Sequence, residues 1–197
     1  MEPLEFFAQA IGIVAMAIGV LSFQQKTQKG IVLMQFCSSI LFAIHYGMIG
    51  GLIACILNSI GIVRAAVFSQ RDKRAWAAHI SWVYVFSAAF IVIYILMFTA
   101  LRDVAFPDGE VTAFDYIVQI LPVIGMIATT VSFRAKNAAS VRALSFISSP
   151  AWFIYNIVTI SIAGVLTEAF VMCSIVIGIF RLDRKKGSAE NGTAKDE

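Results

Sequence analysis

Long apolar runs separated by short polar segments dominate the sequence and restrict it to few fold classes. Of its 197 residues, 59% are hydrophobic and only 14% are charged, whereas soluble domains are about half apolar and a quarter charged. Runs of about 18 or more apolar residues with few charges are typical of transmembrane helices. We therefore predict an all-α integral membrane protein whose main partner is the lipid bilayer.

Seven such runs divide the chain into candidate transmembrane helices. They cover approximately residues 6–23, 31–48, 52–69, 77–101, 116–133, 143–160 and 161–180. The segment 102–115 is the longest loop between them. The tail 184–197 is polar and rich in small residues, and we expect it to be disordered on the cytoplasmic side.

The basic residues alternate between the two ends of these helices. The loops after the first, third, fifth and seventh runs hold nearly all of the Lys and Arg residues. Because basic loops stay on the cytoplasmic side of a membrane, the N-terminus is predicted to lie outside and the C-terminus in the cytoplasm. The net charge of +3 comes from these short loops and forms no patch, so nucleic acid is not expected as a partner.

The chain also repeats itself at an offset of 110 residues. Each copy contains three apolar runs, and the run 77–101 stands alone between the copies, so that both copies have the same direction in the membrane. We predict two parallel three-helix bundles, 1–74 and 116–183, joined by a linker unit, 75–115. Transporters built from parallel repeats bind their substrate near the membrane midplane, between the repeats. Identical pairs include Gln9 and Gln119, Met16 and Met126, Ser22-Phe23 and Ser132-Phe133, Lys26 and Lys136, Ser38-Ser39 and Ser148-Ser149, and Arg71 and Arg181.

Each copy carries a polar and aromatic stripe on its second helix, with residues recurring at steps of three and four as on one helix face. Phe42 and Trp152 suit either stacking on a solute or helix packing. The polar residues near the end of each stripe suit either the entrance of a site or hydrogen bonds between helices. The stripes comprise Gln35, Ser38, Ser39, Phe42, His45 and Tyr46 in the first copy, and Ser145, Ser148, Ser149, Trp152, Tyr155 and Asn156 in the second.

Two polar residues occupy the middle of the third helix of each copy. Asn58 and Glu168 match at the repeat offset, so we expect them to face each other as a solute site. Such an acid in a membrane should face a cavity or a partner, and Glu168 is a candidate for proton coupling, with His45 as a relay. Arg64 is expected to extend to the cytoplasmic surface, with an ion pair to Glu168 as the alternative.

Prolines interrupt two neighbouring helices of the second copy. Pro122 and Pro150 each remove a backbone donor from a helix interior, and neighbouring groups can re-satisfy the freed carbonyls inside a membrane. We interpret them as candidate hinges of a gate, with a static kink as the alternative. Gly12 takes the position of Pro122 in the first copy and is included with them.

Several motifs bear a resemblance to known membrane proteins. The 3+1+3 arrangement, the repeated S-F-x-x-K loop, Pro150-Ala151-Trp152 and the mid-helix polar residues resemble the SWEET and PQ-loop superfamily. The L-P-V-I-G, S-F-R, W-x-x-Y-N and I-x-R segments are similar to YgjV-like proteins of the bacterial inner membrane. This resemblance implies that Asn58 faces a sugar and that the prolines act as hinges. Residue 168 departs from the sugar-facing Asn, and Val123 replaces the Gln of the Pro-Gln pair.

These observations favour a transporter-like protein of the bacterial inner membrane. We expect it to facilitate the passage of a small polar solute, such as a sugar, by alternating access. A non-transporting receptor or membrane-interaction protein of the PQ-loop type is the alternative, and a homo-oligomer remains open. With no metal-ligand cluster and no Gly-rich phosphate loop in the sequence, we expect neither an enzyme nor a cofactor. The three cysteines, Cys37, Cys55 and Cys173, are expected to be buried and reduced.

Overall fold

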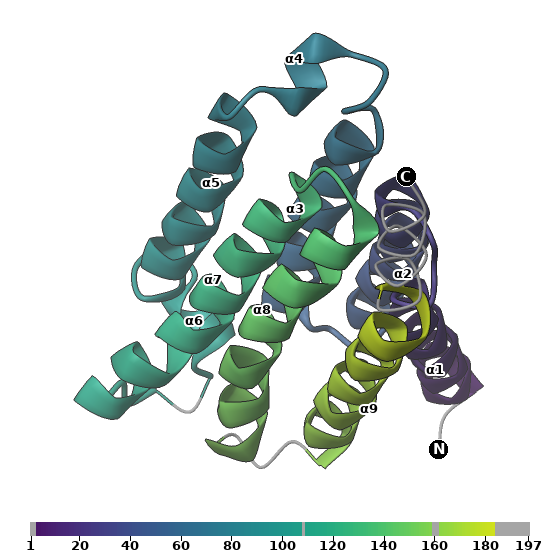
Figure 1. Cartoon of the computed structure of the whole chain (residues 1–197). Helices are drawn as coiled ribbons and strands as arrows, with labels where there is room; N and C mark the ends of the chain where they lie inside the picture. The colour runs from purple at the N-terminus through teal and green to yellow at the C-terminus, as the bar shows by residue number, and fades with distance from the viewer. Residues whose placement is uncertain (1–2, 108, 159–161, 184–197) are drawn as a thin grey trace, which may run out of the picture.

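The computed structural model describes residues 3–107, 109–158 and 162–183 and forms a bundle of long helices (Figure 1). The described residues contain no strand, which confirms the all-α prediction. The predicted disordered tail, 184–197, lies outside the described residues. The long helices are α1 (Pro3–Ser22), α2 (Gln28–Met48), α3 (Leu52–Ser69), α5 (Ser81–Met97), α7 (Ala113–Phe133), α8 (Ala138–Val158) and α9 (Ile162–Gly178). The short elements are α4 (Ala75–Ala78), α6 (Arg102–Ala105) and a π-helical turn, η1 (Ile179–Asp183).

Several helices begin earlier than the apolar runs predict, because capping residues in the loops start them. The Thr27 side chain accepts a hydrogen bond from the Gly30 backbone N–H at 3.0 Å and caps α2. Thr112 and Asp115 form a reciprocal capping box at the start of α7. Each helix extends at its N-terminus beyond its apolar segment and begins next to the residue whose polar side chain accepts hydrogen bonds from its first N–H groups.

The linker region is broken into three helices where we predicted one long helix. The predicted run 77–101 is divided into α4, a turn, and the shorter helix α5, and the predicted loop 102–115 contains α6. Trp82 donates its indole N–H to the Trp76 carbonyl oxygen at 3.0 Å across this turn. The helix that joins the two bundles is therefore only 17 residues long.

The helices pack in a regular order in which α2 lies between α1 and α3, and α8 lies between α7 and α9 (Figure 1). Helix α5 packs against α7 and α3. The helices α1–α3 contact the helices α7–α9 in three pairs: α1 with α9, α2 with α8, and α3 with α7. The middle of the bundle is therefore enclosed by helices from both halves of the chain.

Apolar side chains cover the outside of the bundle. Phe7, Ile117 and Ile147 are 61%, 67% and 66% exposed, although exposed apolar patches this extensive are rare on soluble monomers. Five of the described helical segments are long and apolar enough to cross a membrane: α1, α2, α3, α7, and α9 together with η1 (Gly164–Asp183). Helix α5 is shorter, with 17 residues, and α8 carries Arg142 and several serines. The number of seven spans therefore remains a prediction.

The buried core is concentrated at one end of the bundle, which we call the basic end. It is defined by the loops 23–27, 70–74 and 134–137, which hold most of the loop Lys and Arg residues, and it lies at the top of Figure 1. Phe23, Phe68 and Phe133, at the ends of α1, α3 and α7, are at most 5% exposed and pack with Val141 and Ile175. The opposite end has no comparable cluster among the described residues.

The cysteines do not follow the prediction that they are buried. Cys37 and Cys173 are exposed on the outside of the bundle, and Cys55 is half-buried. A small apolar thiol is compatible with a surface that faces lipid, so the apolar surroundings in the sequence did not indicate burial within the protein.

Candidate functional site

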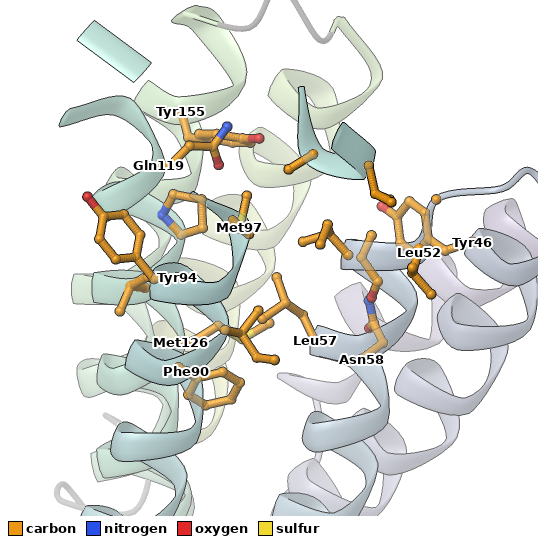
Figure 2. Close-up of a pocket in the computed structure, with 18 of the residues that line it drawn as sticks. Tyr46, Leu52, Leu57, Asn58, Phe90, Tyr94, Met97, Gln119, Met126 and Tyr155 are labelled. Carbon is orange, nitrogen blue, oxygen red and sulfur yellow. The ribbon is translucent and has the colours of Figure 1, made fainter. Parts of the chain in front are cut away.

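A cavity of about 560 Å³ lies between α3 on one side and α5, α7 and α8 on the other. Figure 2 shows Leu57 and Asn58 facing Met126 and Tyr94 across it. We call it the outer cavity, because the α2–α3 turn and α6, at the end opposite to the basic end, contribute to its wall. Of the predicted site residues, it is lined by Tyr46, Asn58, Pro122, Trp152, Tyr155 and Asn156.

A second cavity of about 190 Å³, the inner cavity, lies between the outer cavity and the basic end. Residues from α1, α2, α3, α7, α8 and α9 line it. Leu57, Asn58, Met126 and Trp152 line both cavities and therefore form the partition between them. Of the predicted site residues, the inner cavity is lined by Phe42, Asn58, Trp152 and Glu168.

The central polar pair lines the inner cavity. The Asn58 amide donates to the Ala54 carbonyl oxygen of its own helix at 2.9 Å, which leaves the amide oxygen at the partition. The Glu168 carboxyl hydrogen-bonds the hydroxyl of Ser149, a stripe residue of α8. The structure thus brings Asn58 and Glu168 to one cavity from opposite halves of the chain.

Trp152 is held at the partition by a glycine of the neighbouring helix. A methyl group added to Gly125 of α7 would lie 2.4 Å from the indole nitrogen of Trp152, so the indole packs directly on the α7 backbone. Its ring also contacts Tyr155 edge to face at 6.0 Å, and Tyr155 hydrogen-bonds Gln119. These contacts fix the aromatic wall of both cavities.

His45 lies apart from the cavities, between α1 and α2. Its Nδ1 atom is 2.7 Å from the Ala8 carbonyl oxygen, and its side chain is only 9% exposed. A methyl group on Gly12 would lie 2.9 Å from the same ring nitrogen. The structure therefore places Gly12 and His45 together in a tight helix contact, and His45 does not line the inner cavity with Glu168.

The two prolines occupy different environments. Pro122 is buried in α7 and lines the outer cavity. Pro150 is exposed on α8 and points away from both cavities. Only Pro122 is thus positioned next to the space that a moving helix would open or close.

Arg64 neither extends to the surface nor pairs with Glu168. Its side chain is 5% exposed and lines the inner cavity. One guanidinium nitrogen, Nη1, donates to the Met126 carbonyl oxygen at 3.1 Å and to the Thr130 hydroxyl at 3.3 Å. No salt bridge joins it to a carboxylate among the described residues. The expectation that it extends to the cytoplasmic surface is therefore wrong.

Beyond the inner cavity, polar contacts link the two halves of the chain at the basic end. Arg142 donates to the carbonyl oxygens of Phe23 and Gln25, at 3.0 and 2.8 Å, and pairs with Asp183. The side-chain amide of Gln28 donates to the Phe133 carbonyl oxygen at 2.8 Å. Arg71 donates to the Ala135 carbonyl oxygen at 3.1 Å. Together with the aromatic core, these bonds close this end of the bundle.

Sequence reasoning missed several cavity residues. Arg64 is one of them, because its place near a helix end predicts a surface anchor or an ion pair with Glu168 but does not specify the direction of the side chain. Thr129 of α7, which hydrogen-bonds the Ser148 hydroxyl at 3.4 Å, lines the inner cavity. The adjacent threonines 129 and 130 inside an apolar run were the available signal. Among the described residues, no group of His, Cys, Asp and Glu side chains is suited to holding a metal ion.

Comparison with known families identifies the kind of protein that carries these cavities. The family model described as "Bacterial inner membrane protein" (Imp-YgjV) matches residues 6–186. The chain belongs to this family. The match extends over every helix that lines the two cavities, and it agrees with the apolar exterior in assigning the chain to the bacterial inner membrane. No curated protein and no solved structure matches the chain significantly.

Proposed function

We propose that this inner-membrane protein facilitates the passage of a small polar solute by alternating access between two parallel three-helix units. The single observation that carries the proposal is the pair of adjoining cavities, which lead from the α2–α3 turn to the centre of the bundle and stop at the closed basic end. Transporters built from repeats bind their substrates between the repeats near the membrane midplane, and these cavities lie between helices of both halves.

The order of helix contacts supports a two-fold relation between the units. If α1, α2 and α3 correspond to α7, α8 and α9, the contact of α1 with α9 corresponds to that of α7 with α3. The contact of α2 with α8 then corresponds to itself. This is the pattern expected for two like units that face each other across an axis along the membrane normal.

Hydrogen bonds at equivalent positions support the same relation. Gln35 of α2 donates to the Ser22 hydroxyl of α1 at 2.8 Å. At the repeat offset, Ser145 of α8 donates to the Ser132 hydroxyl of α7 at 3.1 Å. A 3+1+3 architecture with seven spans, of the kind found in the SWEET and PQ-loop superfamily, accounts for both observations and is part of the proposal.

The positive-inside rule gives this arrangement a direction. With the basic end in the cytoplasm, we interpret this arrangement as an outward-facing state with a closed cytoplasmic gate. Passage requires that the bonds of Gln28, Arg71 and Arg142 across the basic end open while the outer cavity closes. Pro122, on the wall of that cavity, is a suitable hinge.

A receptor of the PQ-loop type is the second candidate, since a cavity closed at one end also suits a protein that binds cargo without carrying it. The two functions differ in whether the basic end opens. A cavity open to one side only is what a receptor predicts, and the polar residues of the inner cavity at the centre of the bundle are the feature that leads us to propose transport.

Solute entry into proteoliposomes tests the proposal and can be measured for any solute in turn. Vesicles that carry the protein shrink in a hyperosmotic solute and re-swell as the solute enters, and light scattering follows both phases. Replacing both Asn58 and Glu168 by Leu should abolish re-swelling for the transported solute while the protein remains folded, because the central polar contacts are lost. The folded state is verified by size-exclusion chromatography and thermal unfolding. Re-swelling at the wild-type rate in the double variant would contradict the assignment.

A further inference from the structure

We propose that the inner cavity binds a small zwitterion, with Arg64 receiving its carboxylate and Glu168 its ammonium group. This inference rests on the proposed function and names the substrate class of the same site. It differs from the neutral sugar that the sequence resemblance implies. Four features carry it: the unpaired edge of the Arg64 guanidinium, the rigid support of that guanidinium, the position of Glu168 and the size of the cavity.

The Arg64 guanidinium has one edge without an acceptor. Its two hydrogen bonds to oxygen atoms are both donated by its Nη1 atom. Its Nε atom is buried and has no hydrogen-bond partner among the described residues. Nε and Nη2 form the side of the guanidinium that binds a carboxylate through two parallel N–H···O bonds. A buried donor without an acceptor is costly, and Arg64 lines the inner cavity, so a carboxylate that binds at Nη2 and draws Nε toward the cavity would remove that cost.

The guanidinium is also held in a fixed orientation. Its central carbon lies 5.0 Å from the centre of the Phe133 ring and 5.6 Å from that of Phe90. With the two bonds from Nη1 to α7, these rings support the group without neutralising it. Intramembrane charges are rare, pair with one another or with backbone carbonyls, and mark substrate or ion pathways. No described carboxylate is paired with Arg64.

Glu168 supplies the opposite charge in the same cavity. It reaches the inner cavity from α9, whereas Arg64 reaches it from α3. They form no salt bridge with each other, and Glu168 instead hydrogen-bonds Ser149. An anion alone would satisfy Arg64 but leave Glu168 without a partner of opposite charge, and a neutral sugar would leave the Arg64 guanidinium without a counter-charge. A solute with both charges satisfies both residues.

The volume of the inner cavity suits a small solute. A volume of about 190 Å³ is equivalent to roughly six water molecules at about 30 Å³ each. An amino acid with a side chain as small as a methyl group has matching charges and a small enough volume. Met126 and Trp152 of the partition provide an apolar wall for such a side chain.

Thermal unfolding of the purified full-length chain with small probes tests this inference, because a ligand of the folded state raises its apparent stability. The probes are alanine, which carries both charges, acetate and methylammonium, which carry one each, and glucose. Alanine should give the largest rise in melting temperature. Arg64→Lys keeps the charge but lacks the planar fork, so its affinity for alanine should fall by ~10- to 100-fold, as for one charge-assisted hydrogen bond.

Arg74→Lys is the matched control, because Arg74 is exposed in the α3–α4 loop and lines neither cavity. It should retain the wild-type response to alanine. If Arg64→Lys is poorly folded, Glu168→Gln provides the second test and should also weaken the response. Stabilisation by glucose, by acetate as strongly as by alanine, or by none of the probes would overturn the inference. Glucose entry in the vesicle assay would overturn it while leaving the transport function intact, whereas absence of entry for every solute would count against transport itself.

Discussion

Replacing Arg142 by Gln should lower the free energy of unfolding more than any other single change at the basic end. The side chain is 1% exposed, pairs with Asp183 through both carboxylate oxygens and donates to two carbonyl oxygens of the α1–α2 loop. Removing one partner of a buried ion pair leaves the other uncompensated and costs roughly 3–5 kcal/mol. Chemical unfolding in detergent, followed by circular dichroism, measures this loss.

Lys136→Gln is the control for the loss of one positive charge at the same end. Lys136 is exposed and has no recorded side-chain contact, so its replacement should change the free energy of unfolding by less than about 0.5 kcal/mol. Equal stabilities of the Arg142→Gln and Lys136→Gln variants would show that Arg142 does not hold the α1–α2 loop to α8.

The second large effect is expected for Gly125→Ala in α7. The added methyl group would lie 2.4 Å from the indole nitrogen of Trp152 and 2.6 Å from its Cδ1 atom, distances at which either the ring or the helix must move. Overpacking of this kind typically costs about 1–3 kcal/mol. Because Trp152 belongs to the partition, its displacement should also obstruct solute entry in the vesicle assay.

A matched glycine and a second-site change separate this effect from a general intolerance of alanine. Gly47→Ala should be nearly neutral, since its methyl group would meet only the Cys55 sulfur at 3.9 Å. Trp152→Ala removes the indole altogether, so part of the stability lost with Gly125→Ala should be recovered: Gly125→Ala should cost less in the Trp152→Ala background than in the wild-type protein. No recovery in this double-mutant cycle would contradict the direct contact between the two residues.

The sequence was sufficient to predict an all-α membrane protein and one wall of the candidate site. Apolar runs mark the long helices because a lipid environment selects for them over whole helix lengths. Steps of three and four residues placed Ser148, Ser149 and Trp152 on one face of a helix, and all three line the inner cavity. These patterns depend on local geometry alone, which the sequence contains.

The remaining features depend on how helices are rotated against each other. His45 lies on the predicted stripe, yet it contacts Ala8 of α1. The stripe is broad, so residues along its edge can pack against a neighbouring helix while residues at its centre line a cavity. Arg64 bends inward because Thr130 and the Met126 carbonyl group lie on α7 opposite to it. No local pattern in α3 specifies that partner. Pro150 and the exposed cysteines face outward for the same reason.

The distance between the two repeat-equivalent loops at the basic end is the most direct test of alternating access. Lys26 and Lys136 are both exposed and can be replaced by Cys, spin-labelled and measured by double electron–electron resonance in nanodiscs, after Cys37, Cys55 and Cys173 are changed to Ser. The account predicts two populations of distance, a short one for the closed basic end and a longer one for the open end, in a ratio that alanine changes. A single short distance, with and without every solute tested, would contradict transport and favour a receptor.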